Sequence, residues 1–258
     1  MLISIITINY NDKLGLKKTI NSVRSQTYSN FEHIIIDGGS NDGSKEQIVA
    51  NKDYLAYWVS ERDNGIYNAM NKGIKVAKGE YLFFLNSGDD FTDKYALKNL
   101  SIYLKGTDIV YFNINQIQNN SIKLKRTPKV LSFDFLHSDL PPHQSTFIHK
   151  RLFEEFGYYD EHLKIVSDWK FLIEVLIKHN ATYEYIDEVY TNFYKDGISS
   201  LPENINLIKE EREEVLNNEY TILMNDLKYK YKLERTLRTL RKSRKIKILI
   251  KLGLINRF

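Results

Sequence analysis

The first 91 residues alternate between short, continuous apolar runs and segments in which apolar residues recur at helical spacing. Continuous runs rich in β-branched and aromatic residues are typical of strands buried on both faces. The runs that we interpret as strands are 2–8, 32–36, 55–60 and 80–85. The segments with helical spacing are 14–25, 44–51 and 66–77. Strands that alternate with helices predict parallel pairing with right-handed crossovers, hence an α/β layered fold.

Each of these predicted strands runs directly into a polar cluster. The clusters occupy residues 9–12, 37–44, 61–64 and 86–90. In open α/β sheets, ligands bind outside the carboxyl ends of the strands. The pattern therefore predicts that the four clusters converge on one rim of the sheet, and that a ligand binds there.

The last cluster contains two adjacent carboxylates, Asp89 and Asp90, at the end of the apolar run GEYLFFLNSGDDF. Adjacent carboxylates repel each other and lose hydration when partly buried. A hard divalent cation relieves both costs, and Mg²⁺ is usually held by one or two carboxylates together with substrate phosphates. The alternative is that one of the two residues caps a helix around Tyr95.

Beyond residue 91 the patterns are shorter. Residues 109–114 and 121–126 predict a hairpin that turns near Asn119 and Asn120. Residues 141–148 begin with two prolines and end as a strand. Further helices are expected at 151–157, at 167–179 and from about 203 onward, with an extended segment at 182–186.

The composition limits the class of protein. The chain has 258 residues, 42% of them hydrophobic, and this is typical of a globular protein. It has no cysteine, which excludes a disulfide scaffold and a thiolate zinc site. No run of 18 apolar residues is present, so no transmembrane helix is expected.

Three segments, in this order and spacing, carry a resemblance to a known family. SIITINYND, EHIIIDGGSNDGS and SERDNGIYNAMNKGIKVAKGEYLFFLNSGDDF resemble an inverting family 2 glycosyltransferase, in particular the bacterial enzymes that build surface polysaccharides such as O-antigen, capsule or colanic acid. The resemblance is strong over residues 1–91, fair over 141–195 and absent from the tail. It implies a GT-A fold, a Rossmann-like three-layer α/β/α domain over 1–200, with a donor half at 1–91, an acceptor half at 92–200 and a helical basic extension at 201–258.

The resemblance also implies a set of site residues. Those expected to contact the nucleotide-sugar are Thr7, Asn9, Tyr10, Asp37, Asp42, Asp63, Lys72 and Asp89. Among them, Asp37 would bond the uracil of a UDP-sugar and Asp89 the ribose, while Asp90 would hold Mn²⁺ or Mg²⁺. The usual Asp-x-Asp form is broken here, because Gly88 lies two residues before Asp90. Which of the two carboxylates holds the metal therefore stays open.

Several of these residues also have a purely structural interpretation. Residues 37–39 are typical of a tight turn, and residues 41–43 of a loop that starts a helix. Lys72 can equally be a solvated helix residue, and Tyr10 can pack at the rim without binding anything.

Inverting transfer is a single displacement that needs a general base to take the proton of the acceptor hydroxyl. In the family, the base is an acidic residue near the start of a helix in the second half, and Asp168 in VSDWKF matches it. The alternative is helix capping by Ser167 or Asp168. His143 in PPHQSTF is a further candidate, as a metal ligand or a phosphate donor, with a hydrogen bond at a strand start as its alternative. The loop 194–197 is a weaker candidate for closing over the donor.

The positive charge is concentrated in the tail. Residues 228–258 contain 12 Lys or Arg and one acidic residue, a net charge of +11, so the other 227 residues carry −7 of the total of +4. A cationic amphipathic helix suits an anionic membrane surface. Since acceptors in this family are often glycans or lipid-linked saccharides, we expect a cytoplasmic protein attached peripherally to the inner face of the membrane. A solvated helix or a homodimer-forming helix is the alternative, and no nucleic-acid recognition motif accompanies the charge.

Two other functions compete with the transferase. A sugar nucleotidyltransferase of the same fold would need a Gly-rich basic loop soon after the first strand, and NYNDKLGLKK matches that poorly. A non-catalytic sugar- or nucleotide-binding module would keep its biological activity in Asp90→Ala. Every acidic position that the family resemblance leads us to expect is occupied by an acid in this sequence, and this disfavours the binding-module interpretation.

Overall fold

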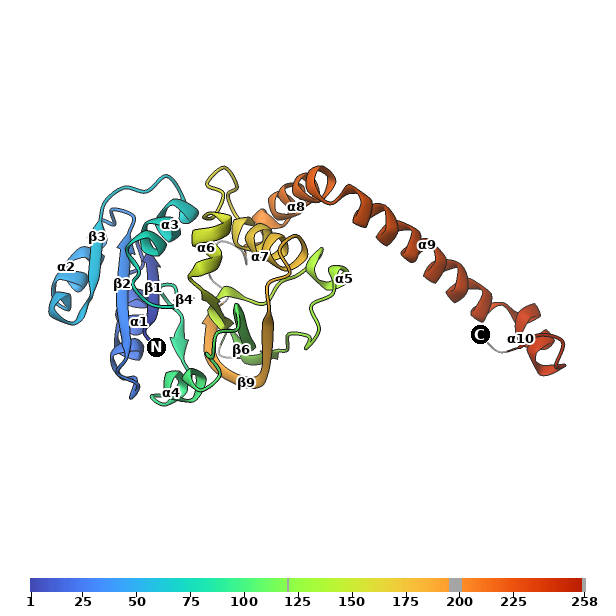
Figure 1. Cartoon of the computed structure of the whole chain (residues 1–258), viewed down its shortest axis with the longest axis horizontal. Helices are drawn as coiled ribbons and strands as arrows, with labels where there is room; N and C mark the ends of the chain where they lie inside the picture. The colour runs from blue at the N-terminus through green and yellow to red at the C-terminus, as the bar shows by residue number, and fades with distance from the viewer. Residues whose placement is uncertain (120, 195–200, 257–258) are drawn as a thin grey trace. The chain divides into compact units, whose positions relative to one another are not determined.

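The computed structural model of the chain describes residues 1–119, 121–194 and 201–256. The chain forms two compact units, of which one comprises Met1–Arg212 and the other begins at Glu213. The first unit is built around a single mixed β-sheet, whose described strands run in the order β3-β2-β1-β4-β8-β6-β9-β5, with β7 paired to β6 (Figure 1).

One half of the sheet is parallel and comes from the first 91 residues. Its strands are β1 (Ile3–Asn9), β2 (Phe31–Asp37), β3 (Tyr57–Ser60) and β4 (Tyr81–Phe84). The connections contain α1 (Lys13–Arg24), α2 (Ser44–Val49), the 3-10 turn η1 (Lys52–Tyr54) and α3 (Ile66–Val76). The alternation of strands and helices predicted for this region is confirmed. The continuous apolar pattern is explained by burial, because every residue of β1 is buried between its neighbours β2 and β4.

The other half of the sheet is mixed. Its strands are β8 (Thr146–His149), β6 (Ile109–Gln118), β9 (Tyr183–Tyr194), β5 (Asp90–Phe91) and β7 (Ser121–Lys125). The predicted β6–β7 hairpin is confirmed, but β6 runs on to Gln118. The extended segment predicted at 182–186 is much longer, since β9 pairs with β6 along most of its length. The two-residue strand β5, which pairs with the end of β9, was not predicted.

The two halves join where β4 pairs antiparallel with β8. Phe83 of β4 stacks on Phe147 of β8, with ring centroids 4.4 Å apart, inside a core of buried aromatic and aliphatic residues. The remaining elements of this half are α4 (Ala96–Ser101), α5 (Phe133–Leu136), the turn η2 (His143–Ser145), α6 (Arg151–Phe156) and α7 (Ser167–Ile177). The helices predicted at 151–157 and 167–179 are thereby confirmed.

Residues 202–251 are mostly helical, in agreement with the helices predicted from about residue 203 onward. Its elements are the turn η4 (Pro202–Asn204), α8 (Ile205–Glu219), α9 (Thr221–Lys242) and α10 (Arg244–Lys251). On α9, the side chains of Tyr229, Leu233, Leu237 and Leu240 are exposed. Among the described helices, none is both long and apolar enough to cross a membrane.

Candidate active site at the carboxyl edge of the sheet

The register of the parallel strands aligns three polar residues at their carboxyl ends. Asn9 of β1 lies beside Asp37 of β2, which lies beside Ser60 of β3. Parallel strands in register carry their last residues to one edge of the sheet. The predicted clusters at the ends of the first three strands therefore do meet there.

Asp37 is the centre of this first group, and its carboxylate is saturated with hydrogen bonds. Oδ1 accepts from the amide of Asn9 (2.7 Å) and the hydroxyl of Ser40 (2.5 Å), while Oδ2 accepts from the hydroxyl of Ser60 (2.6 Å) and the backbone N–H of Ser40 (3.0 Å). Burial alone would raise the pKa of this carboxyl, but the bonds from Ser40, Ser60 and Asn9 outweigh it and hold the pKa below its usual value. Asp37 is therefore a buried anion that its own neighbours stabilise.

Thr7 and Tyr10, which flank Asn9 in the predicted site, have opposite environments. The Thr7 hydroxyl is fully buried, donates to the carbonyl of Leu85 and contacts Nε2 of His33 at 3.0 Å, so it ties β1 to β2 and to the end of β4. The Tyr10 side chain is 69% exposed. Gly38 keeps space beside it, because a Cβ at this position would lie 3.1 Å from the Tyr10 ring and 3.2 Å from the Asp63 carboxylate.

Asp42 makes local structural contacts. It accepts hydrogen bonds from the backbone N–H of Lys13 (2.7 Å) and from the hydroxyl of Ser44 (2.6 Å), and so connects the starts of α1 and α2. These bonds lower the pKa of its carboxyl, that from Ser44 most.

Asp63 and Lys72 contact each other directly. The Lys72 ammonium lies 2.6 Å from Asp63 and 2.7 Å from Glu61. Its charge is thus already balanced by two carboxylates.

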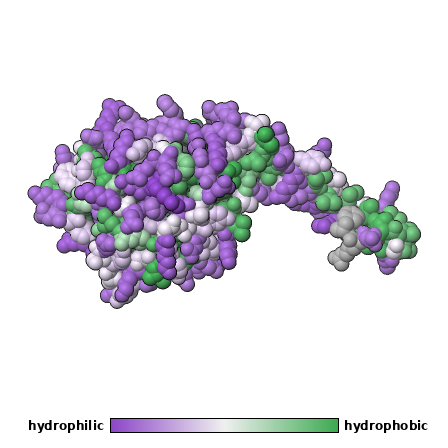
Figure 2. All heavy atoms as spheres, in the orientation of Figure 1, coloured by the Kyte–Doolittle hydropathy of each residue, from purple (hydrophilic) through white to green (hydrophobic). Residues whose placement is uncertain are grey.

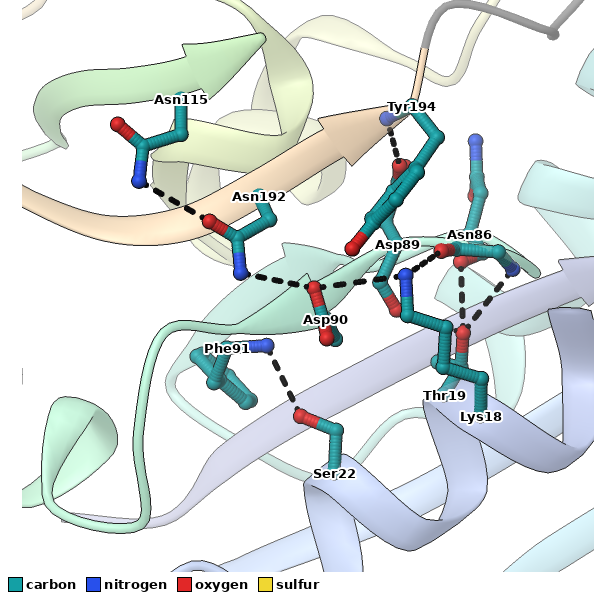
Figure 3. A network of polar contacts seen from close by, with 11 residues as sticks. Lys18, Thr19, Ser22, Asn86, Asp89, Asp90, Phe91, Asn115, Asn192 and Tyr194 are labelled. Atoms are coloured by element: carbon teal, nitrogen blue, oxygen red, sulfur yellow. Dashed lines mark hydrogen bonds and ion pairs between the residues drawn. The ribbon is translucent and has the colours of Figure 1, made fainter. Parts of the chain in front are cut away.

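Asp89 and Asp90 are presented by a short turn that α1 holds in place. Gly88 has a φ of +94°, a left-handed conformation that glycine adopts at little cost. The Thr19 hydroxyl accepts from the Gly88 N–H and donates to the Asp89 carbonyl, and the Ser22 hydroxyl accepts from the Phe91 N–H (Figure 3). The alternative of a helix cap is wrong for both residues, because α4 begins after Tyr95 and the Tyr95 N–H bonds Asp93.

The end of β9 supplies the partners of both carboxylates. The backbone N–H of Tyr194 donates to Asp89 Oδ1 at 3.2 Å, and the amide of Asn192 donates to Asp90 Oδ1 at 3.0 Å. Asn115 of β6 in turn donates to the side-chain oxygen of Asn192 (3.0 Å) and orients it (Figure 3). Of the loop expected at 194–197, Tyr194 ends β9, whereas residues 195–197 lie outside the described residues.

Burial disfavours the ionised form of both carboxyls. Burial raises the pKa of Asp89 to about 7, against weaker opposing effects of the Tyr194 N–H and His143. Burial also raises the pKa of Asp90, although Asn192 and Lys18 oppose it. In the described parts of the chain, no group of three or more acidic or histidine side chains is placed to hold a metal. Carboxylate oxygens are nevertheless the ligands that hard divalent cations prefer, and one or two suffice when phosphates complete the shell, so this pair fits such an ion.

Asp168 lies in a polar chain that links four elements. Its Oδ1 accepts from the Tyr67 hydroxyl of α3 (2.8 Å), and its Oδ2 lies 3.4 Å from Nδ1 of His143. Nε2 of His143 lies 3.0 Å from the amide of Asn86, just after β4. Burial would raise the pKa of Asp168, but His143 and Tyr67 outweigh it and lower the pKa. Both ring nitrogens of His143 therefore face protein partners.

The alternative of a helix cap is also wrong at α7. The residue before the helix is Val166, without a side-chain capping bond, and the buried Ser167 hydroxyl has no partner. Asp168 faces the chain of contacts just described, and its side chain is 15% exposed.

The structure thus brings the predicted residues together in three groups. Asp89, Asp90, His143 and Asp168 are joined in one network through Asn86 and Thr19, Asn9 and Asp37 form a second, and Asp63 and Lys72 a third. The sequence analysis missed the residues that hold the first group in place, namely Lys18, Tyr67, Asn86, Asn115 and Asn192. A usable signal existed only for Asn86, which stands inside the polar cluster after β4.

Several known proteins are similar to this chain in sequence or in fold. The model of the family described as glycosyl transferase family 2 matches residues 4–166. An uncharacterized glycosyltransferase of Mycobacterium tuberculosis (strain CDC 1551 / Oshkosh) is 33% identical over 180 residues, which is 68% of this chain and 69% of that protein.

Two solved structures are similar in fold. The S. aureus TarS structure in complex with UDP-GlcNAc gives a TM-score of 0.63 at 20% identity, covering 76% of this chain and 59% of that one. The mannosyltransferase PcManGT from Pyrobaculum calidifontis, in complex with GDP-Man and Mn²⁺, gives 0.58 at 14% identity, covering 77% and 58%. The chain thus spans a little under three fifths of each, and at these identities the likeness concerns the fold alone.

Proposed function

The chain belongs to glycosyl transferase family 2, and from this membership we propose that it transfers a sugar from a UDP-sugar to a glycan or lipid-linked saccharide in the synthesis of bacterial surface polysaccharide, with inversion at the anomeric carbon. The fold is GT-A and the protein is a glycosyltransferase. The observation that carries the finer proposal is the shared network of Asp89, His143 and Asp168 at the carboxyl edge of the sheet.

We assign the nucleoside to the first group of rim residues. Exposed Tyr10 has its ring close to Gly38, and the anionic Asp37 immediately precedes Gly38 at the end of β2. Hydroxyl groups rotate easily, so Ser40 or Ser60 can turn away and give Asp37 to the N–H of a base. Of the two similar folds, TarS is in complex with UDP-GlcNAc and PcManGT with GDP-Man, so the choice of a uridine nucleotide in this proposal rests on Asp37.

We assign the diphosphate and a divalent cation to Asp89 and Asp90. When bound, such an ion neutralises charge on the departing diphosphate. Asp90 is the more accessible ligand, because its side chain is 20% exposed, while Asp89 is buried and bonded to Tyr194. With its ring nitrogens turned to Asn86 and Asp168, His143 orients Asp168 in this proposal.

We assign the general base to Asp168. Its lowered pKa keeps the carboxyl ionised at neutral pH, so that it is ready to accept a proton. As the acceptor hydroxyl oxygen attacks the anomeric carbon, its proton passes to Asp168. The bond from that carbon to the diphosphate oxygen breaks, and the nucleoside diphosphate leaves with both electrons.

The C-terminal helices support a site of action at a membrane surface. On α9 and α10, basic residues are interspersed with exposed apolar ones, including Leu237, Leu240 and Ile248. Figure 2 shows hydrophobic and hydrophilic atoms side by side on these helices. Apolar contact with the acyl boundary and attraction to anionic headgroups are the two terms that hold such helices at a bilayer. A lipid-linked acceptor would be found at the same surface.

Calorimetric titration with UDP, GDP, dTDP and CMP, each with Mn²⁺, Mg²⁺ or EDTA, tests these assignments. We expect UDP to bind more tightly with the metal, and Asp90→Asn to lose about tenfold or more of that metal-dependent gain. Asp168→Asn should bind UDP normally but lower hydrolysis of the bound UDP-sugar by about 10²–10⁴-fold. Exposed Asp53 provides the control Asp53→Asn. Failure of the wild type to bind any of the four nucleotides would sink the proposal.

A further inference from the structure

Lys18 lies in the middle of α1 and reaches the turn that presents the two carboxylates. Its ammonium donates to the Gly88 carbonyl at 2.9 Å and lies 3.7 Å from Asp90 Oδ1. It also lies 3.0 Å from the centroid of the Tyr194 ring, on its face. Figure 3 shows Lys18 reaching from α1 toward Asp90, with Asn192 approaching from the other side.

The helix that carries Lys18 places its backbone next to the turn of the two carboxylates. Thr19, the next residue, bonds the backbone of Gly88 and Asp89, and Ser22 bonds the backbone of Phe91. The helix and the turn are therefore attached at three points over residues 88–91. The Lys18 side chain starts from this contact, and Gly88 and the Tyr194 ring hold its ammonium near the carboxylates.

The ammonium retains binding capacity in this arrangement. A lysine has three N–H donors, of which Gly88 takes one and the Tyr194 ring faces another. The 3.7 Å separation from Asp90 is longer than an ordinary N–H···O hydrogen bond. The side chain is also 34% exposed, so a ligand can reach it. Lys72 differs in this respect, since two carboxylates hold it at 2.6 and 2.7 Å.

The positive charge of Lys18 favours the binding of an anion beside Asp89 and Asp90. A diphosphate that approaches Asp89 and Asp90 is repelled by both when they are ionised, and a cation held at a few ångströms offsets that repulsion strongly when it is partly shielded from water. A lysine suits this task because its point charge contacts phosphate oxygens without demanding a fixed geometry.

We propose that Lys18 is a donor-binding residue that contacts the diphosphate of the nucleotide-sugar, so that the protein distinguishes nucleoside diphosphates from monophosphates even without a divalent ion. This inference rests on the proposed function and deepens it. The ammonium keeps its contacts to Gly88 and Tyr194 and turns its remaining N–H from Asp90 to a phosphate oxygen. The protein then contains one fixed positive charge for the leaving group, beside any metal.

The test is calorimetric titration of the wild type and Lys18→Met with UDP and UMP, in EDTA and in Mn²⁺. In EDTA, the wild type should prefer UDP to UMP by about tenfold, and Lys18→Met should lose most of that preference. Lys18→Arg should retain it. Lys17 is exposed and directly precedes Lys18 on the same helix, so Lys17→Met should match the wild type in its preference for UDP over UMP. In Mn²⁺ the loss in Lys18→Met should be smaller, because the metal carries more of the charge.

The results separate the failure of this inference from that of the proposed function. If Lys18→Met keeps the wild-type ratio of UDP to UMP affinity in EDTA, Lys18 does not contact the diphosphate. If the wild type binds UDP only with Mn²⁺ and shows no preference in EDTA, the inference is overturned while the proposed function stands. If the wild type binds neither nucleotide in either condition, the proposed function falls and takes the inference with it. A thermal unfolding curve for each variant confirms that it is folded.

Discussion

Two buried carboxylates at the same edge of the sheet have opposite properties. Asp37, at the end of β2, accepts four hydrogen bonds and its pKa is lowered. Asp89, after β4, accepts the backbone N–H of Tyr194 and a side-chain bond from Gln144, and its pKa is raised to about 7. Burial raises the pKa in both cases, and the hydrogen bonds outweigh it only at Asp37. The comparison teaches that the fold itself stabilises one acid as an anion, whereas burial disfavours the anion of the other.

Removing the saturated carboxylate should have the largest effect. Asp37→Ala leaves the buried donors of Asn9, Ser40 and Ser60 without an acceptor, and we expect the free energy of unfolding to fall by about 4 kcal/mol. Urea denaturation at pH 7 measures it, with exposed Asp53→Ala as the matched control. A loss no greater than that of the control would mean that the four bonds do not stabilise the fold.

At Asp89, removing the charge should instead raise the free energy of unfolding. With a folded pKa of about 7 and an ordinary value of 3.8, Asp89 holds its proton in the folded chain at pH values where the unfolded chain has lost it. The free energy of unfolding therefore falls as pH rises from about 4 to 7 and stays low above 7. Asp89→Asn mimics the protonated form, so it should stabilise the metal-free protein by about 2–3 kcal/mol at pH 8.

This gain should vanish below about pH 3, where the folded and unfolded chains both hold the proton. Thermal unfolding of both proteins across this pH range, in EDTA, gives the two curves. A variant that is less stable than the wild type at pH 8 would show that Asp89 is compensated like Asp37, and the contrast between the two acids would disappear.

The smallest expected effect on stability is that of removing a single hydrogen-bond donor to Asp37. Ser60→Ala removes one of its four donors, and the other three still stabilise the anion, so the loss should be about 1 kcal/mol in the free energy of unfolding. The same urea titration detects it. A loss close to that of Asp37→Ala would indicate that the cluster acts as one cooperative unit in which no donor is dispensable.

The parallel half of the sheet could be predicted from the sequence because its signals are local. Apolar runs, helical spacing and the polar residues that end each run all lie within a few positions of one another. Thr7 lies inside the apolar run 2–8, and its hydroxyl points inward to His33 and Leu85, while its contact with the nucleotide stays a prediction. The orientation of a side chain alternates along a strand, and only the pairing with β2 and β4 decides which face is buried.

The support of the candidate site could not be predicted, because it comes from distant pairing. Asn192 meets Asp90 across 102 residues of sequence, and Tyr67 meets Asp168 across 101. No periodicity relates such residues, and β5 is too short to leave a pattern of its own. Lys18 stands in an unremarkable helix, and its role became visible only from the turn that the helix contacts.

The contact between Asp90 and β9 also has a consequence for folding while the ribosome synthesises the chain. The ribosome adds about 5–20 residues per second, so a nascent chain exposes Asp90 for about 5–20 s before Asn192, 102 residues later, is made. During that interval the four parallel strands can already pair, while the partners of both carboxylates do not yet exist. A chain released before residue 192 would thus contain the four parallel strands and lack the β9 partners of both carboxylates.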